Sequence, residues 1–315
     1  MSKPITITAA TALLIAGAVA AFAQTSEPMN GEPPMTQATA STLKVPGASI
    51  HYEKRGRGPL LLIIPGGPQD AGVFDAFAQE LADRYTVVAY DPRGNSRSRF
   101  DGAPQPLDVN QQADDAAALI GAMGQGPALV FGTSGGAQIG LNLAARHPRA
   151  VNALVAHEPP TVMLLDDPSA ELAGIRALQD TYRREGVDAA MAQFFAANGL
   201  GEGDGPSFEE MPPEAMETFQ RVSGNFEYWL AEGMMPLSVA EPDVEALRAG
   251  NAPIVVAIGE GSAGQPIHAM SSALARKLGV EPTSFPGDHM GYEMQMEAFA
   301  QRLHGVLRQA AGDKQ

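Results

Sequence analysis

A serine between glycines lies in the segment GTSGG, residues 132–136, which fits the pattern G-x-S-x-G. The apolar run LVF precedes this segment, and AQIGLNLAARH, which has helical spacing, follows it. This context predicts a sharp strand-to-helix turn that exposes the hydroxyl of Ser134 as a nucleophile at a sheet edge. Side chains at positions 132 and 136 would collide with the neighbouring strand and helix, so both positions need glycine. A strand–helix turn without a catalytic role is the alternative.

A serine hydroxyl attacks a carbonyl only when a base takes its proton. The chain has six histidines. His289 lies in FPGDHMGY, on a glycine-flanked loop after the last short predicted strand, where the chain order Ser…acid…His places the base. We expect His289 to be this base and its neighbour Asp288 to be a surface residue or a local cap of the loop. The other histidines are expected to be structural or surface residues, and they are His51, His147, His157, His268 and His304.

A third residue must orient the imidazole and stabilise its charged form. Glu158 in VAHEPPT ends the strand directly after the nucleophile's strand, and Glu260 follows the strand PIVVAIG. An unpaired carboxylate is costly among the apolar residues and prolines around Glu158, whereas Glu260 lies among glycines and small residues and is easily solvated. We therefore expect Glu158 to be the acid, with Glu260 as the alternative. Ser262 lies near the position where hydrolases with a Ser, a His and an acid often carry an aspartate.

The oxyanion formed by this attack needs two hydrogen-bond donors. One is expected from the backbone N–H of Gly135, directly after the serine at the start of a helix. The other is expected from the loop IPGGPQD, residues 64–70, which follows an early strand. Pro68 has no N–H, so Gly67 is the expected donor in that loop. An ordinary tight turn is the alternative for these residues.

Buried strands alternate with helices along most of the chain. Continuous apolar runs predict strands at 59–67, 84–94, 127–136, 151–160 and 253–259, and helical spacing predicts helices at 73–83, 111–124, 137–146, 269–278 and 292–310. This order indicates an α/β fold with a mostly parallel sheet and helices on both faces.

The strand pattern stops between about 161 and 235, where helical segments rich in Met, Phe and Tyr take over. We therefore expect two parts of one core, at 43–160 and 236–315, and a helical lid at 161–235. The glycine-rich GEGDGP at 201–206 does not follow a strand, so it is interpreted as a lid loop and not as a dinucleotide motif.

The N-terminal residues 1–23 have the features of a signal peptide: Lys3, an apolar stretch at 9–20, and the small residues AFA before Gln24. Cleavage there would make the protein periplasmic or secreted, without stable membrane insertion. An uncleaved membrane anchor is the alternative, but the apolar stretch is shorter than the roughly 20 residues that span a bilayer. Residues 24–42, rich in Pro, Ser, Thr and Gln, are interpreted as a flexible linker.

The net charge of −15 argues against a nucleic-acid partner, because phosphate binding needs clustered Lys and Arg. The chain contains no cysteine, which excludes disulfides and a thiol nucleophile. Neither a metal-binding cluster nor a dinucleotide motif is evident, so no metal or cofactor is expected. The expected partner is a small-molecule substrate. The oligomeric state is not predicted by the sequence.

Together these residues resemble the α/β-hydrolase superfamily across roughly 45–312. A more specific resemblance is to the zearalenone lactonases of fungi, through YEKRGRGP, VFD, SRS, HEPPTVMLLD, PDVEALRAG and PGDHMGY. The resemblance implies a triad of Ser134, Glu158 and His289. It also places the oxyanion donors on Gly67 and Gly135, and a substrate-contacting lid tryptophan on Trp229.

Three features of the chain bear on how far this resemblance extends. The lactonases carry an acidic residue where this chain has Gly66, and no export signal is expected of them. Some haloalkane dehalogenases also carry a glutamate after the same strand, but their nucleophile is an aspartate. Ser134 therefore disfavours dehalogenation and epoxide opening.

The sequence thus predicts an exported serine hydrolase that cleaves a carboxylic ester or lactone through an acyl-enzyme. Trp229 and Met234 are expected to line an apolar pocket, with a place in the lid core as the alternative. Hydrolysis of a C–C or amide bond by the same triad remains open, and so does a non-catalytic ligand-binding role.

Overall fold

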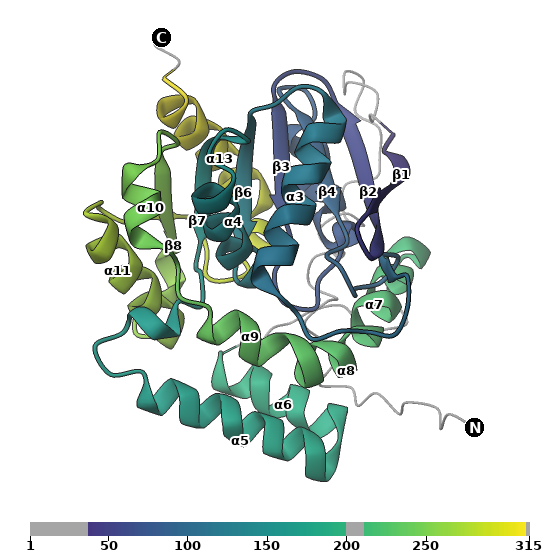
Figure 1. Cartoon of the computed structure of the whole chain (residues 1–315), viewed down its shortest axis with the longest axis vertical. Coiled ribbons are helices and arrows are strands. Elements are labelled where there is room, and N and C mark those ends of the chain that lie inside the picture. The colour runs from purple at the N-terminus through teal and green to yellow at the C-terminus, as the bar shows by residue number, and fades with distance from the viewer. Residues whose placement is uncertain (1–36, 200–210, 313–315) are drawn as a thin grey trace.

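The computed structural model describes residues 37–199 and 211–312, and shows a central sheet between two layers of helices (Figure 1). Within these residues the sheet has nine strands in the order β1-β2-β4-β3-β6-β7-β8-β9, with β5 paired to β2. The strands are β1 (Thr39–Val45), β2 (Ala48–Gly56), β3 (Leu60–Ile64), β4 (Thr86–Tyr90), β5 (Arg99–Phe100), β6 (Ala128–Thr133), β7 (Val151–His157), β8 (Ile254–Gly259) and β9 (Thr283–Phe285). Strands β4, β3, β6, β7, β8 and β9 run parallel, and β1, β2 and β5 pair antiparallel. The expected mostly parallel α/β architecture is confirmed.

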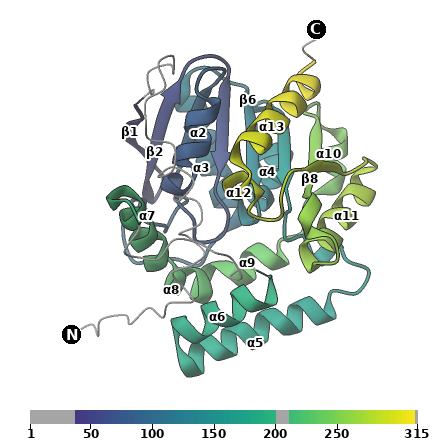
Figure 2. The same ribbon diagram turned by 180° about the vertical axis from the view of Figure 1, so that it is seen from behind.

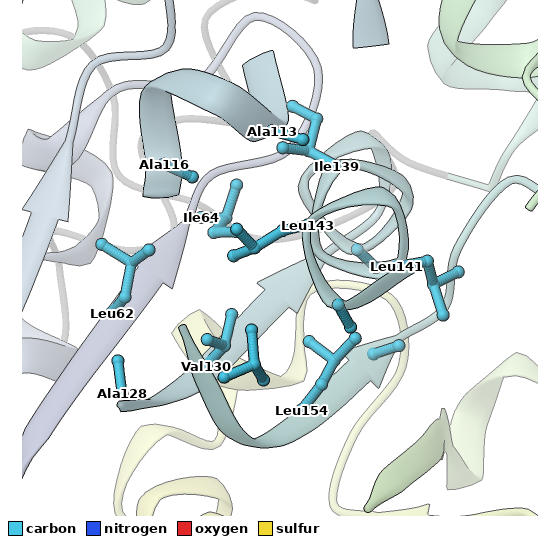
Figure 3. Close-up of a cluster of buried hydrophobic side chains, with 14 of the residues drawn as sticks. Leu62, Ile64, Ala113, Ala116, Ala128, Val130, Ile139, Leu141, Leu143 and Leu154 are labelled. Carbon is cyan, nitrogen blue, oxygen red and sulfur yellow. The ribbon is translucent and has the colours of Figure 1, made fainter. Parts of the chain in front are cut away.

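The inner parallel strands are apolar on both faces because helices cover both sides of the sheet. One face carries α3 (Val109–Met123), α4 (Gly135–Arg146), α10 (Val244–Ala249) and α11 (Pro266–Leu278). Figure 3 shows Leu62 and Val130 of the sheet facing Leu143 of α4 in this layer. The other face carries α2 (Asp75–Leu81), α12 (Gly291–Met294) and α13 (Met296–Ala310), seen from behind in Figure 2.

The register of the central strands brings their carboxyl ends together. Thr133, the last residue of β6, pairs with His157, the last residue of β7, and His157 pairs with Ala257 near the end of β8. Gly259, at the end of β8, pairs with Phe285, at the end of β9. The residues that follow these strands therefore meet at one edge of the sheet, which is where open α/β sheets bind their ligands.

Between β7 and β8 the chain forms the helices that we call the lid helices, α5 to α9. They are α5 (Ser169–Glu185), α6 (Val187–Ala197), α7 (Pro213–Gly224), α8 (Phe226–Tyr228), a π-helical turn (Trp229–Gly233) and α9 (Met234–Val239). They enclose a small core of their own that includes Leu178, Met191, Phe226 and Leu230. Figure 1 shows α5, α6, α8 and α9 lying across one edge of the sheet.

Some boundaries differ from those expected. Strand β1 begins at Thr39, inside the segment interpreted as a linker ending at residue 42, and pairs with β2 along its whole length. Its first four side chains are exposed, so no apolar run marks it, and the turn at Gly47 (φ 77°) sets the pairing. At the lid, α9 continues past residue 235 to Val239.

Other predicted segments lie wholly or partly outside the described residues. These are the signal peptide at 1–23, most of the linker, and the lid loop at 201–206. None of the helices in the described ranges is both long enough and apolar enough to cross a membrane.

Candidate active site

Ser134 occupies a strained turn between β6 and α4. Its backbone has φ 52° and ψ −126°, a conformation that non-glycine residues rarely adopt and that is often held at functional sites. The N–H of Ser134 donates to the carbonyl of His157 (2.8 Å), and this bond holds the turn against β7. A Cβ at Gly132 would lie 2.5 Å from the carbonyl oxygen of Gly136, and one at Gly136 would lie 2.1 Å from that of Ile64. Both positions therefore require glycine, as the sequence predicts.

Glu158 and His289 form a direct pair at the same edge. The Glu158 side chain is fully buried, and its Oε2 lies 2.7 Å from His289 Nδ1. Its other oxygen, Oε1, accepts the N–H of Gly259 (2.9 Å). Because a carboxylate only accepts hydrogen bonds, Nδ1 must carry the proton, which leaves Nε2 of His289 as the nitrogen that can act as a base.

The charge state of Glu158 follows from these contacts. Burial alone raises the pKa of its carboxyl group, but the hydrogen bond from His289 and the electrostatic interaction with that ring outweigh burial. The resulting pKa is about 2. Glu158 is therefore ionised near neutral pH and can stabilise an imidazolium at His289.

The alternative acid, Glu260, points elsewhere. It is exposed, and its Oε1 accepts a hydrogen bond from the hydroxyl of Ser284 (3.0 Å). Ser262, near the position where an aspartate often stands, is buried beside Glu158 and lowers its pKa. The Ser262 hydroxyl lies close enough to the Glu158 carboxylate to favour its charge, but within the described ranges it does not meet the geometry of a hydrogen bond. Asp288 accepts the N–H of Met290 (2.9 Å), which is the local capping expected of it.

His157 lies closest to the pair among the other histidines. Its ring is fully buried and stacks against that of His289, with centroids 6.2 Å apart and planes at 21°. Burial lowers the pKa of His157 to about 3, so this ring is neutral, and its Nδ1 lies 2.9 Å from Thr133 Oγ1. His157 is thus a neutral ring that packs against the imidazole of His289. The histidines that pair with residues elsewhere are His51 with Glu53, His147 with Asp114 and His304 with Tyr85.

The two expected oxyanion donors lie side by side. Gly67 has φ 46°, and Gly135 is the first residue of α4. A Cβ on Gly135 would lie 3.1 Å from the nitrogen of Gly67, so the two peptide groups are neighbours. Neither N–H donates to another residue in the part of the chain that the structure describes. Both remain available to a negatively charged oxygen.

Two side chains that sequence reasoning did not single out hold this loop. Gln69 accepts the N–H of Gly66 (3.2 Å) and donates to the hydroxyl of Tyr292 (2.9 Å). Asn95 Nδ2 donates to the carbonyls of Gly67 (3.1 Å) and Gln69 (2.9 Å). Asn95 lies in a turn after β4, and its sequence context shows no motif that could have marked it.

Gln69 also donates to Glu293 Oε1 (3.4 Å), and burial raises the pKa of that carboxyl group to about 8. Between pH 4.5 and 8 the folded chain therefore keeps a proton that the unfolded chain releases. Stability should then fall as pH rises, by on the order of 1 kcal/mol per pH unit. Replacing Glu293 by Gln removes this dependence. The free energy of unfolding in urea, variant minus unaltered chain, should therefore be more positive at pH 8 than at pH 5. Glu297→Gln, on the exposed side of α13, is the control; equal effects of the two would contradict the buried protonated state.

A cavity of about 370 Å³ opens onto Ser134, His289, Gly67 and Gly135. Its wall is mainly apolar and comes largely from the lid helices. It includes Ile175, Leu178, Phe194, Trp229, Met234 and Leu237. The site residues expected from the sequence therefore lie together. All of them line this cavity except Glu158, which is hydrogen-bonded to the cavity residue His289.

Trp229 serves both roles that the sequence left open. Its side chain is only 6% exposed and packs edge-on against Phe194, with ring centroids 4.8 Å apart. It also lines the cavity, where a Cβ on Gly67 would lie 3.5 Å from its Nε1. The π-helical turn that begins at Trp229 is a feature often found at functional sites. Met234, buried at the start of α9, lines the same wall.

A cluster of three or more His, Asp or Glu side chains suited to a metal ion is absent from the described residues. The arrangement that is present consists of a strained serine, a histidine held by a buried carboxylate, and two free N–H groups. This arrangement is suited to nucleophilic attack on a carbonyl or related centre.

Comparisons with known proteins agree with this architecture. Residues 59–198 match the model of a family described as alpha/beta hydrolase fold. The uncharacterized hydrolase YraK of Bacillus subtilis is 36% identical over 84% of this chain and 95% of its own. A zearalenone hydrolase of Bionectria ochroleuca is 28% identical over 83% of this chain and 95% of its own. A solved thermophilic esterase from Thermogutta terrifontis superimposes with a TM-score of 0.65 at 23% identity, over 87% of this chain and 99% of its own. The chain belongs to the α/β-hydrolase family.

Proposed function

We propose that this protein is a serine hydrolase that cleaves uncharged carboxylic esters or lactones through an acyl-enzyme. The observation that carries the proposal is the buried Glu158 carboxylate bonded to His289 Nδ1, beside a cavity that also exposes Ser134. The name of one relative, a zearalenone hydrolase, agrees with this proposal, and that of another, a 2-(acetamidomethylene)succinate hydrolase, shows that related chains also act on other substrates.

In the first half of the reaction, His289 Nε2 takes the proton of Ser134 as Oγ attacks the carbonyl carbon. The carbonyl oxygen gains negative charge and accepts hydrogen bonds from the N–H groups of Gly67 and Gly135. Collapse of this intermediate breaks the ester C–O bond, and His289 returns the proton to the departing alcohol oxygen. For a lactone, that alcohol stays attached to the acyl group.

In the second half, His289 takes a proton from water, and the resulting hydroxide attacks the acyl-enzyme. Ser134 Oγ leaves with the proton that His289 returns, and the carboxylic acid is released. Glu158 keeps His289 oriented and stabilises its positive charge in both halves. Its pKa of about 2 means that it remains a carboxylate throughout.

The cavity wall indicates an uncharged substrate. Its polar side chains are mostly amides and a hydroxyl, from Gln193, Asn198, Gln265 and Ser238. Within the described ranges it contains no Lys or Arg, and its one acidic side chain is Glu171. Residues 200–210, which lie outside those ranges, contain no Lys or Arg in their sequence. An anionic acyl chain would lose its hydration there without gaining a cation.

Three p-nitrophenyl esters that share a six-carbon acyl chain test this proposal. We expect p-nitrophenyl hexanoate to be hydrolysed with a kcat/KM about 100-fold or more above that of the mono-p-nitrophenyl ester of adipic acid. The methyl p-nitrophenyl diester of adipic acid is the control, because it restores neutrality at greater length, and it should recover most of the rate. A resorcylic lactone completes the panel.

Two outcomes would count against the proposal. If neither the esters nor the lactone are cleaved while an amide or a β-diketone is, the reaction class is wrong. If the free adipate ester is cleaved as fast as the hexanoate, the acyl chain does not occupy this cavity.

We further propose that the protein is exported, on the strength of the signal-peptide pattern at 1–23. Cleavage would leave Gln24 as the first residue. The mass of the N-terminal peptide of the protein recovered from the periplasm or medium checks this, and an intact Met1 would contradict it.

A further inference from the structure

Three consecutive backbone carbonyls of the oxyanion loop are each held by a side-chain amide. Asn95, from the core, donates to the carbonyls of Gly67 (3.1 Å) and Gln69 (2.9 Å). The carbonyl between them, that of Pro68, accepts Nδ2 of Asn225 (2.8 Å). Asn225 belongs to the lid helices, at the end of α7. The loop that carries one oxyanion donor is therefore fixed partly by the core and partly by the lid.

Asn225 uses its whole amide group in this contact. Besides Pro68, its Nδ2 donates to Ser96 Oγ (2.9 Å), and its Oδ1 accepts the N–H of Ser96 (2.7 Å). Its side chain is buried, with 5% of the residue exposed, so an unpaired amide there would be costly. Ser96 itself has φ 46°, a strained conformation that these bonds help to hold.

A second contact ties the same two regions together. Arg221, one turn before Asn225 on α7, donates through Nε to Asp70 Oδ2 (2.8 Å). Asp70 is fully buried, and its Oδ1 accepts the N–H of Gly72 (2.9 Å). The lid thus contacts the oxyanion loop at Pro68 and again at Asp70.

We propose that Asn225 is a positioning residue for the oxyanion hole, acting through the backbone of the Gly67–Gln69 segment. This inference rests on the proposed serine-hydrolase function. The direction of the Gly67 N–H is set by the peptide plane between Gly66 and Gly67, and neither glycine has a side chain to restrain that plane. Bonds to the carbonyls that follow supply that restraint. Seating of the lid and stabilisation of the oxyanion are in this way linked through one side chain.

The test is Asn225→Asp, which keeps the size of the side chain but replaces the donor to Pro68 by an oxygen. We expect kcat for p-nitrophenyl hexanoate to fall about 10- to 100-fold, less than the loss of an entire oxyanion donor. KM should stay within about twofold, because the wall of the cavity is not altered. Gln220→Ala, exposed on the same helix, is the matched control and should behave as the unaltered chain.

A pair of ketones separates positioning from a general structural effect. A trifluoromethyl ketone with a hexyl chain forms an oxyanion adduct with the serine, whereas the methyl ketone of the same length binds largely as the ketone. Asn225→Asp should weaken inhibition by the first by the same factor as kcat, and leave inhibition by the second unchanged. Asn225→Ala, with its thermal unfolding midpoint compared, provides a second variant if the aspartate impairs folding.

Equal weakening of both ketones, or a folded Asn225 variant with full kcat, would overturn the inference while leaving the proposed function intact. Absence of ester and lactone hydrolysis in the unaltered chain would instead remove the reaction itself and overturn both.

Discussion

Replacing Ser134 by alanine is expected to lower kcat for p-nitrophenyl hexanoate by roughly a millionfold. The hydroxyl oxygen is the only heavy atom lost, and alanine has the same Cβ as serine in the strained turn (φ 52°). Without that oxygen no acyl-enzyme can form, and only the oxyanion donors and substrate binding remain to favour attack by water. Steady-state kinetics on the purified variant give the ratio directly.

Ser238→Ala is a suitable control for this loss. Its hydroxyl belongs to a residue that lines the same cavity, but it is bonded to the carbonyl of Met234 (2.9 Å), and its removal should cost little activity. A fluorophosphonate probe should label the unaltered chain and Ser238→Ala, but not Ser134→Ala. A Ser134→Ala variant that keeps its activity would mean that the nucleophile lies elsewhere.

The second large effect is expected from Glu158→Gln, which should lower kcat by about ten thousandfold. The amide has nearly the same shape but carries no charge, so it cannot stabilise the imidazolium. Its NH₂ group can also turn towards Nδ1 and favour the wrong tautomer of His289. Glu260→Gln removes a carboxylate that, within the described residues, accepts a hydrogen bond from Ser284, and the variant should stay near the unaltered rate. Greater loss in Glu260→Gln than in Glu158→Gln would reverse the assignment.

The unaltered chain and Glu158→Gln should also differ in how their stability changes with pH. The pKa of Glu158 is lowered on folding from 4.5 to about 2, so its contribution to stability is complete above pH 4.5 and is lost as pH falls towards 2. The difference in unfolding free energy between the unaltered chain and Glu158→Gln should therefore shrink over that interval. Unfolding by urea at a series of pH values measures it.

Much of this site could be predicted because it depends on chain order at strand ends. Parallel strands place their carboxyl ends on one edge, so a serine after β6 and a glutamate after β7 must be neighbours. The loop after β9 then delivers His289 to the same edge. The choice of Glu158 over Glu260 also followed from local composition, because the apolar context made an unpaired carboxylate costly there.

The remaining features depend on contacts between segments far apart in the sequence. Asn225 and Ser96 are separated by 129 residues, and nothing in either local sequence indicates that they bond. Nothing in the local sequence of Glu293 marks it as buried, yet the fold buries it and burial raises its pKa. Strand β1 was missed for a different reason: its pairing relies on backbone hydrogen bonds and a turn, not on an apolar face.

The position of the proposed acid, directly after β7, has an evolutionary consequence. In the proposed mechanism, the nucleophile and the acid follow two adjacent central strands, and the segment after β8 supplies no catalytic carboxylate. That segment leads into α11, whose first turn contributes Pro266 and Ile267 to the cavity wall, with Gln265 just before it. Mutations there can reshape the acyl pocket without disturbing the triad. Substrate range and catalytic chemistry can therefore diversify independently in proteins built on this plan.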